Sequence, residues 1–354
     1  MIAAFDHPFL SGLLGDAEMT SLLGVEAEIA AMLRFESILA DVEGAFGIIP
    51  ADAADAITSA LAGFQPDMQA LKRGVARDGV VAPELVRQIR QSVGEPHSKY
   101  VHFGATSQDV IDTAMVLRAR SCLDLLEERL GGLVAAFADI DRRFGSSRLM
   151  GRTRMQAAMP ITVANRIESW RAPFLRHSER LATLRKSLLV IQFGGAVGTL
   201  ETLGGDAKNV RSALAERLGL DDAEQWQSQR DRIADLANWL SLVTGTLGKF
   251  GQDIALMAQS GDEIELAGGG ASSSMAHKQN PIDAEVLIAL ARFNAIQLSG
   301  MHQALVHEQE RSGAAWTLEW MILPQMVMAA GASTRAAERL VRNVIAIGSK
   351  PSGI

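Results

Sequence analysis

Three long runs of apolar residues recur at steps of three and four, and they constrain the fold more than any other feature of this 354-residue sequence. They lie within residues 123–144, 163–191 and 233–257. Steps of three and four place apolar side chains on one stripe of an α-helix. A helix of about 30 residues is about 45 Å long. Helices of that length are normally buried in a bundle, often one that several subunits build together.

The rest of the chain also reads as helical. Residues 281–308 and 313–343 predict two further long helices, and Pro173 is expected to kink the helix over 163–191 without ending it. Glycine and proline divide the first 100 residues into shorter helices. We therefore predict an all-α fold with three parts. These are an N-terminal helical domain over 1–100, a long-helix bundle over 101–345 and a tail over 346–354.

Charge and cysteine content exclude several classes of function. The net charge of -7 provides no basic surface for nucleic acid. Cys122 is the only cysteine, which excludes an intrachain disulfide and a multi-cysteine metal site, and we expect it to be buried in a helix. The N-terminus lacks the basic region of a signal peptide, and the apolar stretch over 187–200 is too short to span a membrane. We expect a cytoplasmic protein without a membrane partner.

The segment over 268–281, GGGASSSMAHKQNP, is the strongest candidate for chemistry. Its glycines and serines cannot form a stable helix, so it predicts a flexible flap between two helices. Asn280 is expected to cap the next helix and Pro281 to occupy its first turn. Lys278 beside that helix end would stabilise a carboxylate or an enolate-like charge. The alternative is a solvated loop that carries an incidental lysine.

Two more polar segments stand before long helices. In the segment over 101–109, Thr106 and Asp109 have the spacing of a capping box, which by itself predicts only a helix start. The segment over 151–162 carries two arginines, a threonine and a glutamine before a helix that we expect to begin near Pro160. Its alternative interpretation is a basic loop that neutralises nearby acids.

In this order, the three segments resemble the conserved regions of the fumarase/aspartase superfamily. The flap is similar to the superfamily signature GSSxMPxKxNP, with Ala271 and Ala276 in place of its Gly and Pro. TSQD resembles the first conserved region and GRTRMQAAMP the second. Segments 33–50, 100–109 and 310–320 look like those of the bacterial 3-carboxy-cis,cis-muconate cycloisomerase branch. The resemblance implies a homotetramer built on a long-helix bundle, with the superfamily's small C-terminal domain mostly absent.

The resemblance also implies a reaction and a set of site residues. A carbanion would form and be stabilised as an aci-carboxylate, with Ser272 transferring the proton and with Lys278 and Asn280 stabilising the intermediate. No metal or redox cofactor is implied, and the only expected partners are a small polycarboxylate substrate and further copies of the chain. Each active site would combine segments from three subunits. The residues implied to bind substrate are His102, Thr106, Ser107, Gln108, Arg152, Thr153, Arg154, Gln156, Ser273, Met275 and Arg311.

Arg154 departs from the pattern of the adenylosuccinate lyases, which carry a histidine there. An arginine cannot donate a proton at neutral pH, but it can hold a carboxylate with two hydrogen bonds. Three alternatives stay open: an adenylosuccinate- or argininosuccinate-type lyase that releases fumarate, a cycloisomerase of 3-sulfomuconate, and a helical scaffold without activity. His102 is expected to act as a polar group that orients the substrate; the alternative is a structural role, since a histidine next to an aromatic residue is more often structural.

Overall fold

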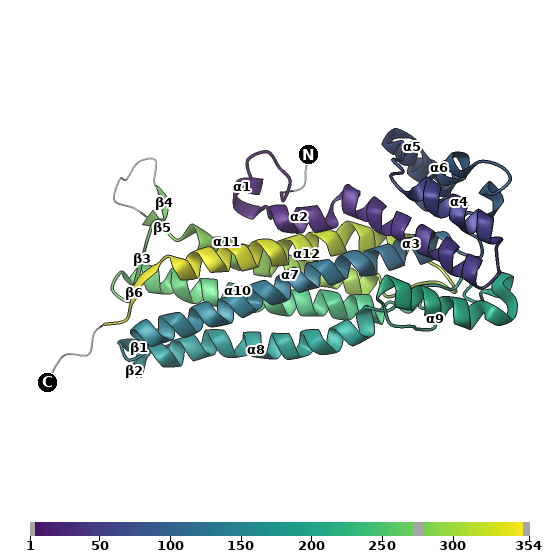
Figure 1. Ribbon diagram of the computed structural model, residues 1–354. Coiled ribbons are helices and arrows are strands. Elements are labelled where there is room, and N and C mark those ends of the chain that lie inside the picture. The colour runs from purple at the N-terminus through teal and green to yellow at the C-terminus, as the bar shows by residue number, and fades with distance from the viewer. Residues whose placement is uncertain (1–3, 272–278, 350–354) are drawn as a thin grey trace.

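Long helices packed side by side form the body of the protein in a computed structural model that describes residues 4–271 and 279–349 (Figure 1). Each of the expected long helices is present, and the helices over 163–188 and 313–342 run through Pro173 and Pro324. The prediction of an all-α bundle is therefore confirmed. The long helices are α7 (Ser107–Phe144), α8 (Val163–Leu188), α10 (Asp231–Ser260), α11 (Ile282–Gln303) and α12 (Gly313–Arg342).

An aromatic cluster lies where α7, α8 and α10 pack together. The Phe137 ring stacks on Phe174 with centroids 5.8 Å apart, and it meets the edge of Phe250 at 5.1 Å. Trp170 contacts Phe250 at 5.1 Å and donates its indole N–H to Asp253 at 2.7 Å. All four rings are almost fully buried. Burying one such side chain contributes about 1.5–3 kcal/mol, so the apolar stripes seen in the sequence do hold these helices together.

Most of the shorter helices gather at the end of the bundle where α7 begins, whereas those over 11–14 and 17–23 lie along its side (Figure 1). The salt bridge between Arg129 of α7 and Asp16 ties the N-terminal segment to the bundle. Cys122 is buried within α7, as expected. The shorter elements are α1 (Ser11–Leu14), α2 (Ala17–Leu23), α3 (Val25–Ala45), α4 (Ala51–Leu61), α5 (Met68–Asp78), α6 (Ala82–Val93), α9 (Ala207–Leu218) and the 3-10 helices η1 (Ser98–Tyr100) and η2 (Glu201–Asp206).

Three short antiparallel pairs lie at the opposite end, where α7 finishes (Figure 1). β1 pairs with β2, β3 with β6, and β4 with β5. The strands are β1 (Arg148–Thr153), β2 (Gln156–Thr162), β3 (Ile264–Leu266), β4 (Gly270–Ala271), β5 (Gln279–Asn280) and β6 (Val344–Ile347).

Two expected helix starts were wrong. The helix predicted near Pro160 begins only at Val163, because Pro160 pairs with Met150 inside the β1–β2 hairpin and Thr162 forms the cap. A two-stranded hairpin has only edge strands, where a proline is tolerated. Asn280 is not the cap of α11, because its backbone pairs with Gly270 and Pro281 takes the cap position. Both errors have the same cause, since short strand pairs leave no periodic signal in the sequence.

In the described part of the chain, no helix combines the length and the hydrophobicity that crossing a membrane would require.

Candidate active site

The first turn of α7 is fastened to a glycine-rich loop by Asp109. The predicted capping box is confirmed: Thr106 is the N-cap, and its backbone N–H donates to Asp109 Oδ2 at 3.0 Å. The same carboxylate accepts from the Gln192 side chain at 3.0 Å and from the backbone N–H groups of Gly194 and Gly195 at 2.9 Å. Complete burial raises the pKa of Asp109 to about 6, although these four donors oppose the rise. The carboxylate is therefore mainly ionised at neutral pH.

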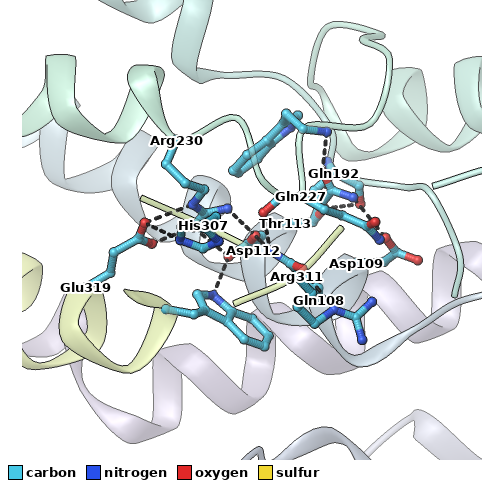
Figure 2. A network of polar contacts seen from close by, with 12 residues as sticks. Gln108, Asp109, Asp112, Thr113, Gln192, Gln227, Arg230, His307, Arg311 and Glu319 are labelled. Carbon is cyan, nitrogen blue, oxygen red and sulfur yellow. Dashed lines mark hydrogen bonds and ion pairs between the residues drawn. The ribbon is translucent and has the colours of Figure 1, made fainter. Parts of the chain in front are cut away.

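Arg311 meets this turn from a distant part of the sequence (Figure 2). Its Nη2 donates to Thr106 Oγ1 at 3.2 Å and to the Ala196 carbonyl at 3.3 Å, while its Nε donates to Gln108 Oε1 at 3.0 Å. Nη1 has no hydrogen-bond partner among the described residues, and the side chain is only half-buried. Two expected substrate ligands, Thr106 and Arg311, thus form one polar surface with a donor still available.

Gln108 lies beneath that surface. It is fully buried, and its Nε2 donates to the Gln227 carbonyl at 2.7 Å and to Asp112 Oδ2 at 3.1 Å. With its Oε1 accepting from Arg311, the amide has no free edge for a substrate. The expected role of Gln108 as a direct ligand is therefore corrected to that of a support that orients Arg311. Ser107, one residue earlier in the first turn of α7, is partly exposed.

A buried ion network continues from Gln108 into the bundle (Figure 2). Arg230 Nη1 lies 2.6 Å from Asp112 Oδ2, and its Nη2 lies 2.5 Å from Glu319 Oε2. Trp316 donates its indole N–H to Asp112 at 3.1 Å, and the His307 ring lies 3.5 Å from Glu319. Burial lowers the pKa of the Arg230 guanidinium, but the two carboxylates outweigh it and keep the group charged.

The network belongs to the site because it fixes Gln108, which in turn holds Arg311. Three of its side chains, Asp112, Arg230 and Glu319, line an apolar cavity of about 450 Å³ between α3, α5, α7 and α12. Sequence reasoning missed Asp112, Arg230 and Glu319. These residues could have been recognised in the sequence as charged residues that follow apolar ones within a predicted helix, as in the run Val110-Ile111-Asp112. A buried ionised side chain needs a partner of opposite charge. Here Asp112 comes from α7, Arg230 from the N-terminal end of α10 and Glu319 from α12.

His102 lies three residues before the turn Ala105–Thr106 and faces α3. Its Nδ1 is 2.6 Å from Glu36 Oε1, and its side chain is 12% exposed. Glu43, two helical turns further along α3, is completely buried, and neither of its carboxyl oxygens has a hydrogen-bond partner among the described residues. Burial, together with the charge of Glu36, raises the pKa of Glu43 to about 9, so this carboxyl is neutral at physiological pH.

Replacing Glu43 by Gln is expected to stabilise the fold at pH 7 and above. The carboxyl has a higher pKa in the folded state than the ordinary value of 4.5, so its contribution to stability is fully present only below about pH 4.5 and is lost as the pH rises toward 9. Gln cannot ionise, and the expected gain is about 2–3 kcal/mol at pH 7. Urea unfolding midpoints of both proteins at pH 5 and pH 8 measure it. An identical pH dependence in the two proteins would contradict the assignment.

The second group of expected ligands lies on the β1–β2 hairpin. Thr153 and Gln156 are register partners, and Arg154 and Met155 form the turn between them with φ of 47° and 65°. Positive φ at both central residues is the geometry of a tight hairpin turn. All of these side chains are exposed.

Arg152 on the same hairpin forms an ion pair with Glu263 at 2.7 Å. Together with Arg154, Arg166 and Lys249 it lines a groove of about 730 Å³ between the hairpin, α8 and α10. The carboxylates of Glu263 and Asp253 also line this groove and pair with Arg152 and Lys249. Among the described residues Arg154 and Arg166 have no such ion pair, so these two cations are the ones available to an anionic ligand. The ion pair between Arg152 and Glu263 also anchors the hairpin to the segment that leads into β3.

The two groups of ligands lie at opposite ends of the bundle (Figure 1). α7 connects them, and its 38 residues correspond to a length of about 57 Å. No movement of a side chain or a loop within one chain closes such a distance. A site that uses both groups therefore requires more than one copy of the chain.

Four expected site residues, Ser272, Ser273, Met275 and Lys278, lie outside the described residues. Asn280, the last residue of β5, is partly buried. Its partner in β4 is Gly270, and this short strand pair lies at the same end of the bundle as the hairpin (Figure 1).

The chain is similar to several known proteins. The family model described as Lyase matches residues 25–294. The 3-carboxy-cis,cis-muconate cycloisomerase of Pseudomonas aeruginosa is 40% identical over 359 residues, which cover 96% of this chain and 77% of that protein. The crystal structure of 3-carboxy-cis,cis-muconate lactonizing enzyme from Pseudomonas putida matches with a TM-score of 0.89 at 37% identity, over 95% of this chain and 76% of that one.

A crystal structure of fumarate lyase from a Mesorhizobium species matches with a TM-score of 0.87 at 33% identity, over 94% of this chain and 76% of that one. The family model covers all three polar segments and most of the bundle, and both structures share the long-helix architecture over nearly the whole chain. The chain therefore belongs to the lyase family of the fumarase/aspartase superfamily.

Proposed function

We propose that this protein is a cycloisomerase that converts 3-carboxy-cis,cis-muconate to 4-carboxymuconolactone in the breakdown of protocatechuate. The observation that carries the proposal is the 40% identity, over nearly the whole chain, to a relative of that name. The paired Arg311 and Thr106 support it, because they offer several hydrogen-bond donors to a carboxylate in one place.

The reaction joins two parts of one molecule. A carboxylate oxygen of the substrate adds to the conjugated double bond, and the electron pair moves onto the neighbouring carbon and its carboxylate as an aci-carboxylate. Ser272 then delivers its proton to that carbon, and the alkoxide that is left is reprotonated from the solvent. Lys278 and Asn280 would stabilise the dianionic intermediate, since preorganised donors are most effective where charge develops. Ser273 and Met275 would contact the substrate from the same segment.

Substrate binding uses both ends of the bundle. At one end, Arg311, Thr106, Ser107 and His102 would hold one carboxylate near the start of α7, where the helix N-terminus also favours an anion. At the other end, the hairpin residues Arg152, Thr153, Arg154 and Gln156 would hold the others. A substrate with three carboxylates suits two such clamps, and Arg154 serves as a clamp because a guanidinium stays charged at every relevant pH.

We further propose a homotetramer whose active sites are shared between subunits. The length of α7 supports this, because it keeps the two clamps of one chain about 57 Å apart. Large apolar side chains that are exposed on four of the bundle helices support it too, since a partner bundle would cover them. They are Leu175 (48% exposed), Leu242 (48%), Ile296 (74%) and Met321 (62%).

Mixing two inactive variants is expected to restore activity if sites are shared. Ser272→Ala and Arg154→Ala each damage a different segment, so a tetramer with both kinds of subunit contains some sites with neither change. The measurement is activity after the two proteins are unfolded together and refolded, compared with each variant treated alone. A mixture that is no more active than its components would count against shared sites.

A single assay tests the reaction itself. Incubation with 3-carboxy-cis,cis-muconate should remove the ultraviolet absorbance of the conjugated diene without releasing fumarate. Release of fumarate from adenylosuccinate or argininosuccinate would instead identify a lyase of the kind that the Mesorhizobium structure is named for. Parallel incubation with 3-sulfomuconate determines whether the clamps accept a sulfonate in place of the third carboxylate.

A further inference from the structure

His102 is held in an uncommon backbone conformation. Its φ is 61°, in the left-handed region that side chains with a Cβ disfavour. The chain turns again at Gly104, with φ of 66°, where an added Cβ would lie 2.9 Å from the Leu203 side chain. Arg90 of α6 supports the turn from outside, because its Nη2 donates to the Val101 carbonyl at 3.0 Å. This packing fixes the direction of the His102 ring.

The ring is directed at one carboxylate. Glu36 is 2% exposed, and its Oε1 lies 2.6 Å from His102 Nδ1, which is the distance of a charge-assisted hydrogen bond. No other hydrogen bond to this carboxylate is present among the described residues. With Nδ1 engaged, only Nε2 is left to meet a ligand. A carboxylate behind the first nitrogen of a histidine fixes the tautomer and orientation of the ring and stabilises its charged form.

We propose that Glu36 is a positioning residue, which accepts the Nδ1–H of His102 and thereby presents the Nε2–H of a charged imidazolium to a substrate carboxylate beside Thr106. This inference rests on the proposed function, and it adds a residue of α3 that lies outside the three polar segments to which the site residues were assigned. His102 touches the substrate in this scheme, whereas Glu36 acts only through His102.

The charges around the ring agree with this role. Glu36 faces it from α3, and the charges of Arg90 on α6 and Asp109 on α7 also act on it. Glu43 is the other buried carboxyl of α3 and lies near Glu36. Burial lowers the pKa of His102, but Glu36 and, more weakly, Asp109 outweigh burial and Arg90, and the net pKa lies above the ordinary value. Glu43 is neutral below its pKa of about 9, so Glu36 supplies the negative charge from α3. Loss of Glu36 would leave burial dominant and the ring uncharged at neutral pH.

The test compares Glu36→Gln with the matched control Glu43→Gln, which makes the same substitution two turns along the same buried helix face. Histidine C2 hydrogen–deuterium exchange, followed by mass spectrometry across pH, reports the pKa of His102 without any activity assay. We expect this pKa to fall by on the order of one unit or more in Glu36→Gln and to stay unchanged in Glu43→Gln. Glu36→Asp, which keeps the charge but shortens the reach, should lie between them.

The kinetic arm uses 3-carboxy-cis,cis-muconate. Glu36→Gln should raise KM about tenfold at pH 7.5 with a smaller change in kcat, the size expected for one lost charge-assisted hydrogen bond. Lowering the pH should recover part of that loss by protonating His102, so the upper limb of the kcat/KM profile should move to lower pH. A variant that is merely destabilised would lose kcat without this shift.

A third arm replaces the substrate with tricarballylate, an unreactive tricarboxylate. Its binding should slow the exchange of His102 in the wild type and much less so in Glu36→Gln. This arm holds even if the muconate is not turned over, so failure of the proposed reaction is distinguished from failure of the positioning role. An unchanged His102 pKa in Glu36→Gln overturns the proposal. So does a lowered pKa that leaves both KM and tricarballylate protection at their wild-type values.

Discussion

Ser272→Ala is expected to reduce kcat by about 10²–10⁴-fold, the range that positioned proton transfer contributes in enzymes. The reaction needs a proton at the carbon that carries the new negative charge, and alanine cannot supply one. A serine hydroxyl is a weak acid and base unless its surroundings stabilise the alkoxide, and Lys278 is the nearest cation in the sequence. KM should change little, because the substrate's carboxylates are held by other residues. Steady-state kinetics on 3-carboxy-cis,cis-muconate measure both quantities.

Ser274→Ala is the matched control, since it removes a hydroxyl from the same run of three serines but from a position outside the matched signature. It should keep kcat within a few-fold of the wild type. Equal losses in the two variants would show that the segment tolerates no change of packing, and a fully active Ser272→Ala would refute the role of Ser272. A single-turnover measurement separates a slower chemical step from slower product release.

Arg230→Met is expected to destabilise the protein by about 3–5 kcal/mol, because it leaves two carboxylates buried without a counter-ion. Asp112 and Glu319 are 1% and 4% exposed, and Arg230 is the cation that lies between them. In the wild type, burial raises the pKa of Glu319, but the hydrogen bonds and charges of Arg230 and His307 together outweigh burial and lower the net value. Without Arg230, the two groups would be stable in the folded state only when protonated.

The sign of the pH dependence follows from this change. Glu319 with a lowered pKa stabilises the wild type above its unfolded-state pKa and loses that contribution as the pH falls. In Arg230→Met the pKa of Glu319 should rise instead, because the main opposition to burial is removed, so stability is lost as the pH increases. The difference in free energy of unfolding between the wild type and Arg230→Met should therefore be small near pH 4 and large at pH 8. Urea unfolding at one fixed protein concentration measures it.

Arg142→Met tests whether the loss comes from burial or from the removal of any ion pair. Arg142 pairs with Asp139 on the exposed face of α7, with side chains 75% and 42% exposed. Exposed pairs contribute about 0–1 kcal/mol, so this variant should be nearly as stable as the wild type. A comparable loss in both variants, or none in Arg230→Met, would contradict the interpretation of the network. Arg230→Met should also weaken substrate binding, since Asp112 then no longer holds Gln108 beneath Arg311.

The bundle was predictable because its signal is local. Apolar residues at steps of three and four specify α7, α8 and α10, and the capping pair Thr106 and Asp109 fixes the start of α7 within one turn. The β1–β2 hairpin was not predictable in this way. Its turn has Arg154 and Met155 at positive φ instead of glycine or asparagine, and six or seven residues per strand are too few to establish a period against the strong helical pattern around them.

The candidate site divides in the same way, into features that were predictable from local sequence and contacts that were not. The residue types in the three polar segments, and their resemblance to a superfamily, were readable from the chain itself. That Arg311 lies on Thr106, that Gln108 is fully buried under both, and that Glu36 lies behind His102 were not, because these pairs are 205, 203 and 66 residues apart in sequence. Contacts between such distant positions depend on how the helices pack, which no single segment encodes.

The sequence alone therefore determined the helices, their approximate ends and the chemistry of the candidate ligands, since each depends on neighbours within one or two turns. The tertiary structure decided which candidate ligands share a surface, which are buried as supports, and that one helix of about 57 Å separates the two groups of candidate ligands. The physical reason is that burial and pairing of charges depend on the whole packed bundle: an ionised side chain enters the interior only where distant parts of the chain supply its partners.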